Sequence, residues 1–313
     1  MKKIGILYGI EDAFPQAFID RVNAKGKKAI IAESVSIDKV VQNKDGEYAV
    51  IIDRISHDVP FYRAYLKNAV LTGTNVINNP FWWSADDKFF NNSFAAALGI
   101  PLPNTVLLPS AAHPSGTIEK SFRNLKYPMD WESIFNYIGF PAYMKPYVGG
   151  GQKNVYRIDN KEDFWEKHRE TGQLVMLLQE EIGFSEYFTV YCLGCKDVKI
   201  MQYEPRHRHH VRHIPTSMPV NKKLAAMLKE YTLRICKGLG YDFNTVEFGV
   251  RDGIPYAIDF GNPVPNVDLS SLGAENFEWV FETSAKMAIV AAKKQKPGKM
   301  NLTWGDFIKK ATN

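Results

Sequence analysis

One lysine and a run of glycines form the stretch of the sequence best suited to holding a phosphate group. Lys145 follows the apolar residues 142–144, and Pro146 ends that run because proline has no N–H for a strand ladder. The glycines at 149–151 follow at once, and an extended pattern resumes at Val155. Glycine N–H groups can approach phosphate oxygens closely, and an ammonium group adds a positive charge. The pattern therefore predicts a β-hairpin with a phosphate-binding loop, whereas three glycines alone would indicate only a flexible turn.

Two carboxylates and an amide mark a second hairpin further along the chain. Glu247 and Asp259 fall on two predicted strands joined by an Asp-Gly turn at residues 251–253. Asn262 follows, and oxygen ligands of this kind suit Mg²⁺. The neighbouring residues are apolar, so we favour metal ligands over simply exposed carboxylates. Two residues separate Asp259 from Asn262, so the two face one side only if Gly261 permits a bulge.

A segment rich in arginine and histidine follows a predicted strand between these two hairpins. It runs from residue 204 to 213 and includes Arg206 and Arg208. Because arginine presents a planar fork to phosphate and carboxylate groups, we favour an anion clamp in which these two arginines are catalytic. A transition-metal site is a second interpretation, since His209 and His213 are one helical turn apart. A solvated basic loop is the third.

Hydrophobic periodicity predicts the elements that must position these groups. Residues 1 to about 85 alternate apolar runs with amphipathic helices, which indicates an α/β domain with a parallel, doubly wound sheet. Later residues combine hairpins with helices into two α+β units. We therefore expect an N-terminal domain over 1–103, a central unit over 104–180 and a C-terminal unit over 181–313. Strands are expected at 4–8, 28–32, 48–53, 75–78, 106–108, 142–144, 155–158, 174–178, 187–193, 200–203, 245–250 and 255–260, and helices at 13–23, 61–72, 131–138, 161–170, 221–238 and 278–293.

Polar residues at the ends of the predicted N-terminal elements are candidates for binding and capping. Ligands of doubly wound sheets bind at the carboxyl ends of the strands, where Glu11, Arg54 and His57 are expected. Ser84 is expected to cap the helix that follows the last strand of this domain. Asp87 is expected in the first turn of that helix, where a negative charge complements the helix dipole.

The composition is that of an ordinary soluble protein and excludes several classes. The 313 residues are 45% hydrophobic and 23% charged, with a net charge of +5, which is too small and dispersed to indicate nucleic-acid binding. No apolar run approaches the roughly 20 residues of a membrane helix. The 3 cysteines are too few for a disulfide framework, so a reducing cytoplasm is expected. Cys192-Leu-Gly-Cys195 lies between β-rich runs and predicts a hairpin turn rather than a zinc site.

Four motifs, in order and along nearly the whole chain, resemble those of the ATP-grasp superfamily. They are D-D-K followed by G-I-P-L-P-N-T, I-G-F-P-A-Y-M-K-P with the glycine loop, Q-E-E-I-G-F-S-E, and V-E-F-G-V-R-D-G-I-P-Y-A-I-D-F-G-N-P. The layout is most similar to that of D-alanine–D-alanine ligases and of carboxylate–amine ligases that form peptides. The resemblance implies an N-terminal α/β domain followed by two α+β units that clamp ATP.

The resemblance also implies roles in nucleotide binding. Lys88 and Lys145 would hold the α- and β-phosphates. Gln179, Glu180 and Ile182 would contact adenine, partly through backbone groups, and Glu186 would bind the ribose hydroxyls. The loop of Gly149, Gly150 and Gly151 would cover the phosphates.

For the metal, the resemblance implies that Glu247, Asp259 and Asn262 bind Mg²⁺. The chain departs from related ligases, which often have aspartate at the position of Glu247. D-alanine ligases commonly have an arginine where this chain has Thr245, and the arginine-rich segment is the expected source of the missing cation.

The expected function is an ATP-dependent ligase. A substrate carboxylate attacks the γ-phosphate to give an acyl phosphate and ADP, and an amine then displaces phosphate. Amino acids or a peptide are the expected substrates, and a homodimer is an allowed assembly. A non-catalytic ATP-binding module and a small-molecule kinase are the alternatives. A dinucleotide-dependent oxidoreductase would need G-x-G-x-x-G after the first strand, which residues 8–12 lack.

Overall fold

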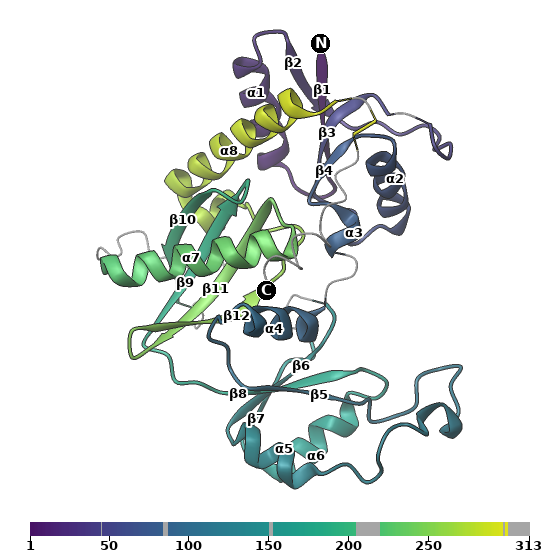
Figure 1. Cartoon of the computed structure of the whole chain (residues 1–313), viewed down its shortest axis with the longest axis vertical. Coiled ribbons are helices and arrows are strands. Elements are labelled where there is room, and N and C mark those ends of the chain that lie inside the picture. The colour runs from purple at the N-terminus through teal and green to yellow at the C-terminus, as the bar shows by residue number, and fades with distance from the viewer. Residues whose placement is uncertain (45, 84–86, 150–152, 205–219, 297, 300–313) are drawn as a thin grey trace. The chain divides into compact units, whose positions relative to one another are not determined.

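The computed structural model divides the chain into two compact units, each described here by itself (Figure 1). It describes residues 1–44, 46–83, 87–149, 153–204, 220–296 and 298–299. Residues 1–86 and 185–313 form one unit, called here the discontinuous unit, and residues 87–184 form the inserted unit. The predicted boundaries at 103 and 180 differ from this grouping, and the division into three domains stays a prediction.

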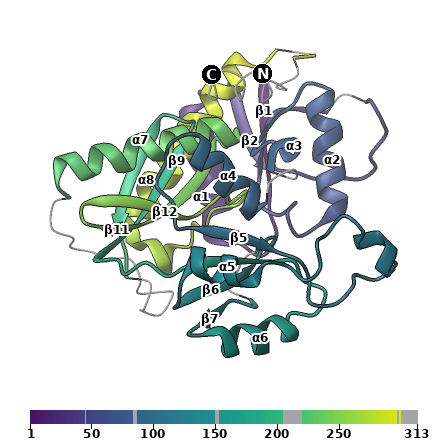
Figure 2. The same cartoon turned by 60° about the horizontal axis from the view of Figure 1, so that its bottom comes forward.

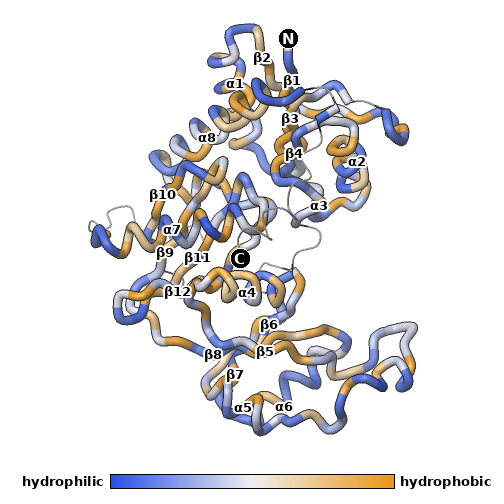
Figure 3. The backbone as a smooth tube through the Cα atoms, in the orientation of Figure 1, coloured by the Kyte–Doolittle hydropathy of each residue, from blue (hydrophilic) through white to orange (hydrophobic). Residues whose placement is uncertain are grey.

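A parallel sheet forms the N-terminal part of the discontinuous unit, as the alternating pattern predicted. Its strand order is β2-β1-β3-β4. The strands are β1 (Lys2–Leu7), β2 (Ile30–Ser34), β3 (Tyr48–Asp53) and β4 (Asn75–Ile77). The central strands are buried on both faces, which is typical of parallel sheets and explains their continuous apolar runs. In Figure 3 this apolar character is visible along β3, in contrast to the hydrophilic helix α6 (Lys161–Glu170).

Helices cover both faces of this sheet. The helix α1 (Ala13–Lys25) buries Phe18 and Val22 on the face that carries Ile4 and Ile6. The opposite face packs against α2 (Pro60–Leu71), and the short α3 (Pro80–Trp83) follows β4. Successive residues of a strand point to opposite faces, so each face has its own apolar cluster. The predicted doubly wound arrangement is confirmed.

An antiparallel sheet forms the C-terminal part of the same unit. Its order is β10-β9-β11-β12. The strands are β9 (Glu186–Leu193), β10 (Asp197–Gln202), β11 (Phe243–Arg251) and β12 (Ile254–Phe260). The helix α7 (Lys222–Leu239) contacts all four strands. The predicted turn at Cys192–Cys195 is confirmed, since β9 and β10 pair as neighbours on either side of it.

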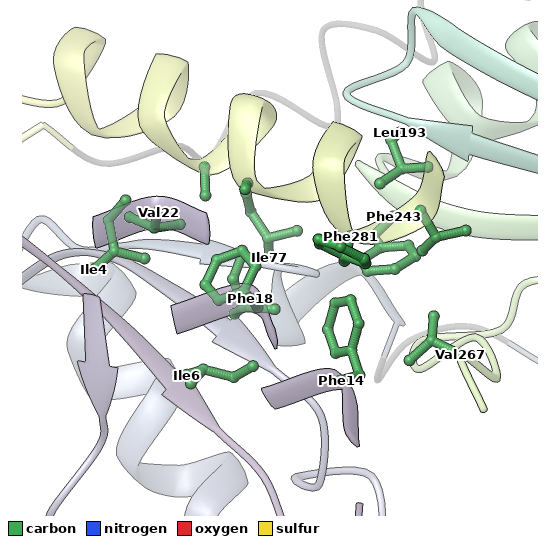
Figure 4. Packing of buried hydrophobic residues seen from close by; sticks show 14 of the residues in the cluster. Ile4, Ile6, Phe14, Phe18, Val22, Ile77, Leu193, Phe243, Val267 and Phe281 are labelled. Carbon is green, nitrogen blue, oxygen red and sulfur yellow. The ribbon is translucent and has the colours of Figure 1, made fainter. Parts of the chain in front are cut away.

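The helix α8 (Leu269–Lys294) joins the two sheets of the discontinuous unit. It packs along α1, β1 and β3 and also touches β9. Figure 4 shows the resulting core, in which Phe14 of α1 and Phe281 of α8 lie near Phe243 of β11. At the C-terminal end of α8, the ammonium of Lys2 donates to the carbonyl oxygen of Ala292 (2.6 Å). A lysine at this end satisfies carbonyls that have no partner within the helix.

The inserted unit is an antiparallel sheet with helices, ordered β5-β8-β6-β7. Its elements are α4 (Lys88–Ala97), β5 (Thr105–Leu108), the 3₁₀ helix η1 (Glu119–Phe122), α5 (Trp131–Ile138), β6 (Ala142–Pro146), β7 (Tyr156–Ile158), α6 and β8 (Met176–Glu180). The helices α5 and α6 cover one face of the sheet, as Figures 1 and 2 show from two sides. None of the described helices of the chain is long and apolar enough to cross a membrane.

The predicted start of α4 was wrong. The helix α4 begins at Lys88, and the carboxylate of Asp87 caps it by accepting from the N–H of Phe90 (2.6 Å). Asp87 therefore precedes the first turn instead of lying in it, and Ser84 falls outside the described residues. Serine and aspartate are both good N-caps, so the sequence alone could not choose between them.

Two glycines with nearly equal positive φ allow a matched test of the packing of Gly240 against Trp82. Gly240 ends α7 with φ 72°, and a Cβ there would lie 2.7 Å from a ring carbon of Trp82. Gly253, in the β11–β12 turn, has φ 74°, and a Cβ there would meet no atom within 4 Å. We expect Gly253→Ala to lower the free energy of unfolding by about 1 kcal/mol through backbone strain. Gly240→Ala should lower it by more, because the contact with Trp82 adds to that strain. Equal losses in urea unfolding would contradict this packing.

Candidate functional site

In the inserted unit, Lys145 lies on the face of the sheet opposite α5 and α6. Strand alternation places it there, because its neighbour Met144 points into the apolar cluster under those helices. Its ammonium donates to the side-chain oxygen of Gln179 (3.0 Å), and the Gln179 amide donates to the Thr105 hydroxyl (2.8 Å). This contact orients the ammonium through a neutral amide, so the bond does not neutralise its charge.

The backbone brings Lys88 to the same corner of the inserted unit. Its N–H donates to the carbonyl oxygen of Tyr147 (2.9 Å), two residues after Lys145. The start of α4 is thereby tied to the chain that leaves β6. Two lysines that are distant in the sequence thus have neighbouring backbones, as their predicted shared role requires.

The glycine loop is described only at its first residue. Gly149 has φ 100° and is exposed, and a side chain there would meet no atom within 4 Å. Only glycine adopts this conformation readily, so the residue suits a turn with an accessible backbone. Gly150 and Gly151 lie outside the described residues, and their role stays a prediction.

The residues expected to contact adenine lie at the end of β8. The backbone N–H of Glu180 donates to the carbonyl oxygen of Asn104 (3.0 Å), and the Asn104 amide donates to the Glu180 carboxylate (3.1 Å). Gln179 and Ile182 are buried. The sheet therefore already uses the Glu180 N–H. The adenine contacts stay a prediction, for which the positions of Gln179 and Ile182 on this strand end are suitable.

In the discontinuous unit, Glu247 and Asp259 lie directly opposite one another on β11 and β12. Glu247 is half-buried and Asp259 is exposed. Directly opposed side chains on antiparallel strands are about 5 Å apart at Cβ, and like charges in such pairs are destabilising. A divalent cation between them would remove the repulsion, and carboxylate oxygens are the ligands that Mg²⁺ prefers. The donor set therefore fits the predicted metal.

Asn262 lies beyond the end of β12, and its position is set by two hydrogen bonds. Its N–H donates to the side-chain oxygen of Asn244, and its own side-chain oxygen accepts from the N–H of Val264, both at 3.1 Å. Gly261 has φ 85°, so glycine is needed here for a turn, while the irregularity in strand pairing falls after Glu247 instead. The amide oxygen retains a second lone pair for a cation. Metal ligation by Asn262 stays a prediction.

Tyr203 is a residue of this region that sequence reasoning missed. Its hydroxyl donates to a carboxylate oxygen of Glu247 (3.0 Å), and the side chain is buried. Burial and the nearby Glu247 raise the pKa of Tyr203, so the hydroxyl keeps its proton and remains a donor. It orients Glu247 from β10 across the sheet. No local motif marks such a residue, because the contact depends on how the strands pair.

The remaining predicted residues divide between the two units or fall outside the description. Glu186 is the exposed first residue of β9 in the discontinuous unit, and its ribose contact stays a prediction. Arg206 and Arg208, with the rest of 205–213, lie outside the described residues, so the anion clamp stays a prediction. Among the residues that are described, no group of three or more His, Cys, Asp or Glu side chains could hold a metal ion.

The candidates at the carboxyl ends of the parallel strands do come together, but they bind one another. Arg54 forms an ion pair with Glu11, with 2.9 Å between the Arg54 Nε and a carboxylate oxygen, and its side chain is 1% exposed. His57 lies 3.4 Å from its neighbour Asp58. The Arg54 guanidinium and the Glu11 carboxylate are therefore committed to contacts within the protein.

Comparison with solved structures shows that the chain has the ATP-grasp fold. It is similar to D-alanine–D-alanine ligase from Bacillus anthracis complexed with ATP (TM-score 0.63, 16% identity, 94% of this chain and 98% of that one). It is also similar to the ATP-grasp ligase PsnB complexed with minimal precursor, Mg and ADP (0.62, 13%, 92% and 97%). The macrocyclase MdnC from Microcystis aeruginosa, bound with precursor peptide MdnA, is a third (0.62, 12%, 93% and 100%). No protein-family model and no curated protein sequence matches the chain.

Replacing Lys145 tests the nucleotide-binding half of the site. We expect Lys145→Met to weaken binding of ADP by about 10- to 100-fold, because a charge-assisted hydrogen bond contributes about 1.5–3 kcal/mol. Lys161→Met is the matched control, since Lys161 pairs with Glu132 on the surface of the same unit. Calorimetric titration measures both affinities. An unchanged affinity in Lys145→Met would show that this lysine is not a phosphate ligand.

Replacing Glu247 tests the metal-binding half. Glu247→Gln keeps the shape and still accepts from Tyr203, but removes one of two opposed charges. In the metal-free protein we expect the free energy of unfolding to stay the same or rise by a few tenths of a kcal/mol. Binding of Mn²⁺, measured by electron paramagnetic resonance, should weaken at least tenfold. A loss of stability without a loss of metal affinity would mean that Glu247 is a structural residue.

Proposed function

We propose that the protein is an ATP- and Mg²⁺-dependent ligase that joins a carboxylate to an amine. The observation that carries this proposal is the direct pairing of Glu247 with Asp259 on adjacent strands of a chain with the ATP-grasp fold. Carboxylate oxygens are the ligands that Mg²⁺ prefers, and in this fold the two lie on the hairpin that the ATP-grasp resemblance assigns to Mg²⁺. Support from the inserted unit comes from the neighbouring backbones of Lys88 and Lys145.

The proposed reaction needs no nucleophilic side chain. An oxygen of the substrate carboxylate attacks the γ-phosphorus of ATP, the bond to the β-phosphate oxygen breaks, and ADP leaves. The amine nitrogen then attacks the acyl carbon, loses a proton and displaces phosphate. The protein's contribution is to orient the reactants and to stabilise charge as it moves. Lys88 and Lys145 would neutralise phosphate oxygens of ATP and ADP.

Mg²⁺, when bound, would draw charge from the phosphate oxygens that it contacts. Glu247, Asp259 and Asn262 are the residues that would hold it. Tyr203 would keep the Glu247 carboxylate oriented. The backbone bond from Asn262 to Asn244 would keep the amide side chain near the end of β12.

The substrates are proposed as a class. The similar structures named above are a D-alanine–D-alanine ligase, a ligase complexed with its minimal precursor and a macrocyclase bound with a precursor peptide. We therefore propose amino acids or carboxylate-bearing peptides as substrates of this chain. Glu186, Gln179, Glu180 and Ile182 are proposed contacts of the nucleoside.

Trapping with hydroxylamine tests the reaction type. Purified protein with Mg-ATP is incubated with pools of amino acids, dipeptides and glutamate- or aspartate-containing peptides, and ADP release is followed. We expect one pool to release ADP and, when hydroxylamine replaces the amine, to yield a hydroxamate, because hydroxylamine captures an acyl phosphate.

Three outcomes separate the alternatives in this experiment. A stable phosphorylated product without hydroxamate would identify a small-molecule kinase. Nucleotide binding without ADP release from any pool would favour a non-catalytic module. ADP release that persists in Lys145→Met and Glu247→Gln at the wild-type rate would point to a contaminating ATPase and would contradict the proposed site.

A further inference from the structure

The chain that leaves β12 is fixed by side chains from distant elements. Residues 261–268, called here the return segment, connect β12 to α8 and carry Asn262 near their start. Three backbone carbonyls along it each accept a hydrogen bond from a side chain outside the segment. These are Pro263 from Asn78 (2.7 Å), Pro265 from Arg54 (2.7 Å) and Asn266 from Tyr191 (2.6 Å). A segment without regular structure is therefore held at three points.

Asn78 joins the return segment to the strand that carries Glu247. Its side-chain oxygen accepts from the N–H of Phe243 (2.9 Å), and its amide donates to the carbonyls of Phe243 and Pro263, both at 2.7 Å. The residue is 2% exposed, so water cannot replace these bonds readily. One amide thus sets the start of β11 and the return segment relative to each other.

Arg54 holds the next part of the return segment from a buried position. Its guanidinium lies over the rings of Phe14 and Phe243, 5.2 and 5.5 Å from their centroids, and pairs with Glu11. Its Nη1 atom has no hydrogen-bond partner among the described residues. Burying a charge and an unpaired donor is unfavourable, and an apolar side chain would fill such a site at less cost. The guanidinium therefore contributes something other than stability, and its bond to Pro265 shows what it positions.

The beginning of the return segment is held by a side chain of β11. Asn244 is fully buried and accepts from the N–H of Asn262. Val267 of the return segment packs in the core near Phe243, as Figure 4 shows. Asn262 is consequently fixed by its own bond to Asn244 and by the contacts of later residues of the return segment. Its position relative to Asp259 follows from these contacts.

We infer that Arg54 and Asn78 are positioning residues for the divalent cation: they hold the return segment so that Asn262 stays beside the Glu247–Asp259 pair. The inference rests on the proposed function, which supplies the cation. It also explains why polar groups at the carboxyl edge of the parallel sheet, the usual ligand edge, face the chain itself. In this protein that edge binds the return segment.

The test uses the full-length protein and two measurements. Amide hydrogen exchange of residues 261–268 is compared in metal-free wild type, Arg54→Met and Asn78→Leu. Affinity for Mn²⁺ is measured by electron paramagnetic resonance in the presence of a non-hydrolysable ATP analogue. We expect exchange in the return segment to accelerate and Mn²⁺ affinity to fall about 10- to 100-fold, the usual effect of removing a group that orients a metal ligand. Arg54→Lys, which keeps a donor, should recover part of the affinity.

Matched variants separate positioning from general stability. Arg63→Met removes an arginine that binds the carbonyl of Ser56 and stacks on Trp83 but does not touch the return segment. It should leave Mn²⁺ affinity unchanged. Tyr191→Phe deletes one hydroxyl and keeps the ring, so it should fold even if Arg54→Met does not, and it should also weaken Mn²⁺ binding.

The outcomes distinguish this inference from the proposed function. Wild-type Mn²⁺ affinity in Arg54→Met, or in Tyr191→Phe if Arg54→Met does not fold, would overturn the positioning role, even if exchange accelerates. If wild type binds no Mn²⁺ and Glu247→Gln changes nothing, the proposed function fails instead. An equal loss of affinity in Arg63→Met would show that the effect reflects stability alone and would also overturn the inference.

Discussion

The discontinuous unit depends on the hydrogen bonds that a single buried amide makes between its two sheets. Asn78 ends the parallel sheet, and its side chain matches both the N–H and the carbonyl of Phe243, where β11 begins. The inserted unit separates these residues in the sequence, so no local preference can bring them together. A hydrophobic contact would allow β11 to shift along its axis, whereas an amide that both donates and accepts hydrogen bonds is compatible with only one alignment of the strand. The register of the strand that carries Glu247 is therefore set from the N-terminal part of the chain.

Two charged groups of the proposed site are each oriented by a neutral side chain of their own unit. The proposed phosphate-binding lysines belong to the inserted unit, and the opposed carboxylates belong to the discontinuous unit. In each case a neutral group orients the charged one, Gln179 for Lys145 and Tyr203 for Glu247. A neutral partner fixes the geometry of a charged group without cancelling its charge through that bond. The ion pair of Arg54 with Glu11 is the contrasting case, since each charge there has an oppositely charged partner within the protein.

Local physics explains which features the sequence could predict. The helices at 131–138 and 161–170 have the predicted bounds, because N-caps and an apolar stripe define them within a few residues. The hairpin of β11 and β12 follows from its Asp-Gly turn, and their pairing places Glu247 opposite Asp259. The roles of Tyr203, Asn78 and Arg54 were not predictable, because each depends on contacts between elements far apart in the chain. The predicted start of α4 was wrong because Ser84 and Asp87 are both suitable N-cap residues.

The position of α8 has a consequence for how the chain is made. This helix covers one face of the parallel sheet, yet it is translated after both the inserted unit and the antiparallel sheet. At about 5–20 residues per second, roughly ten to forty seconds pass between completion of β4 and of α8. During that interval the apolar face formed by β1 and β3 lacks its final cover, although the strands themselves are complete. The N-terminal sheet of this protein therefore reaches its stable form only after α8 has been synthesised.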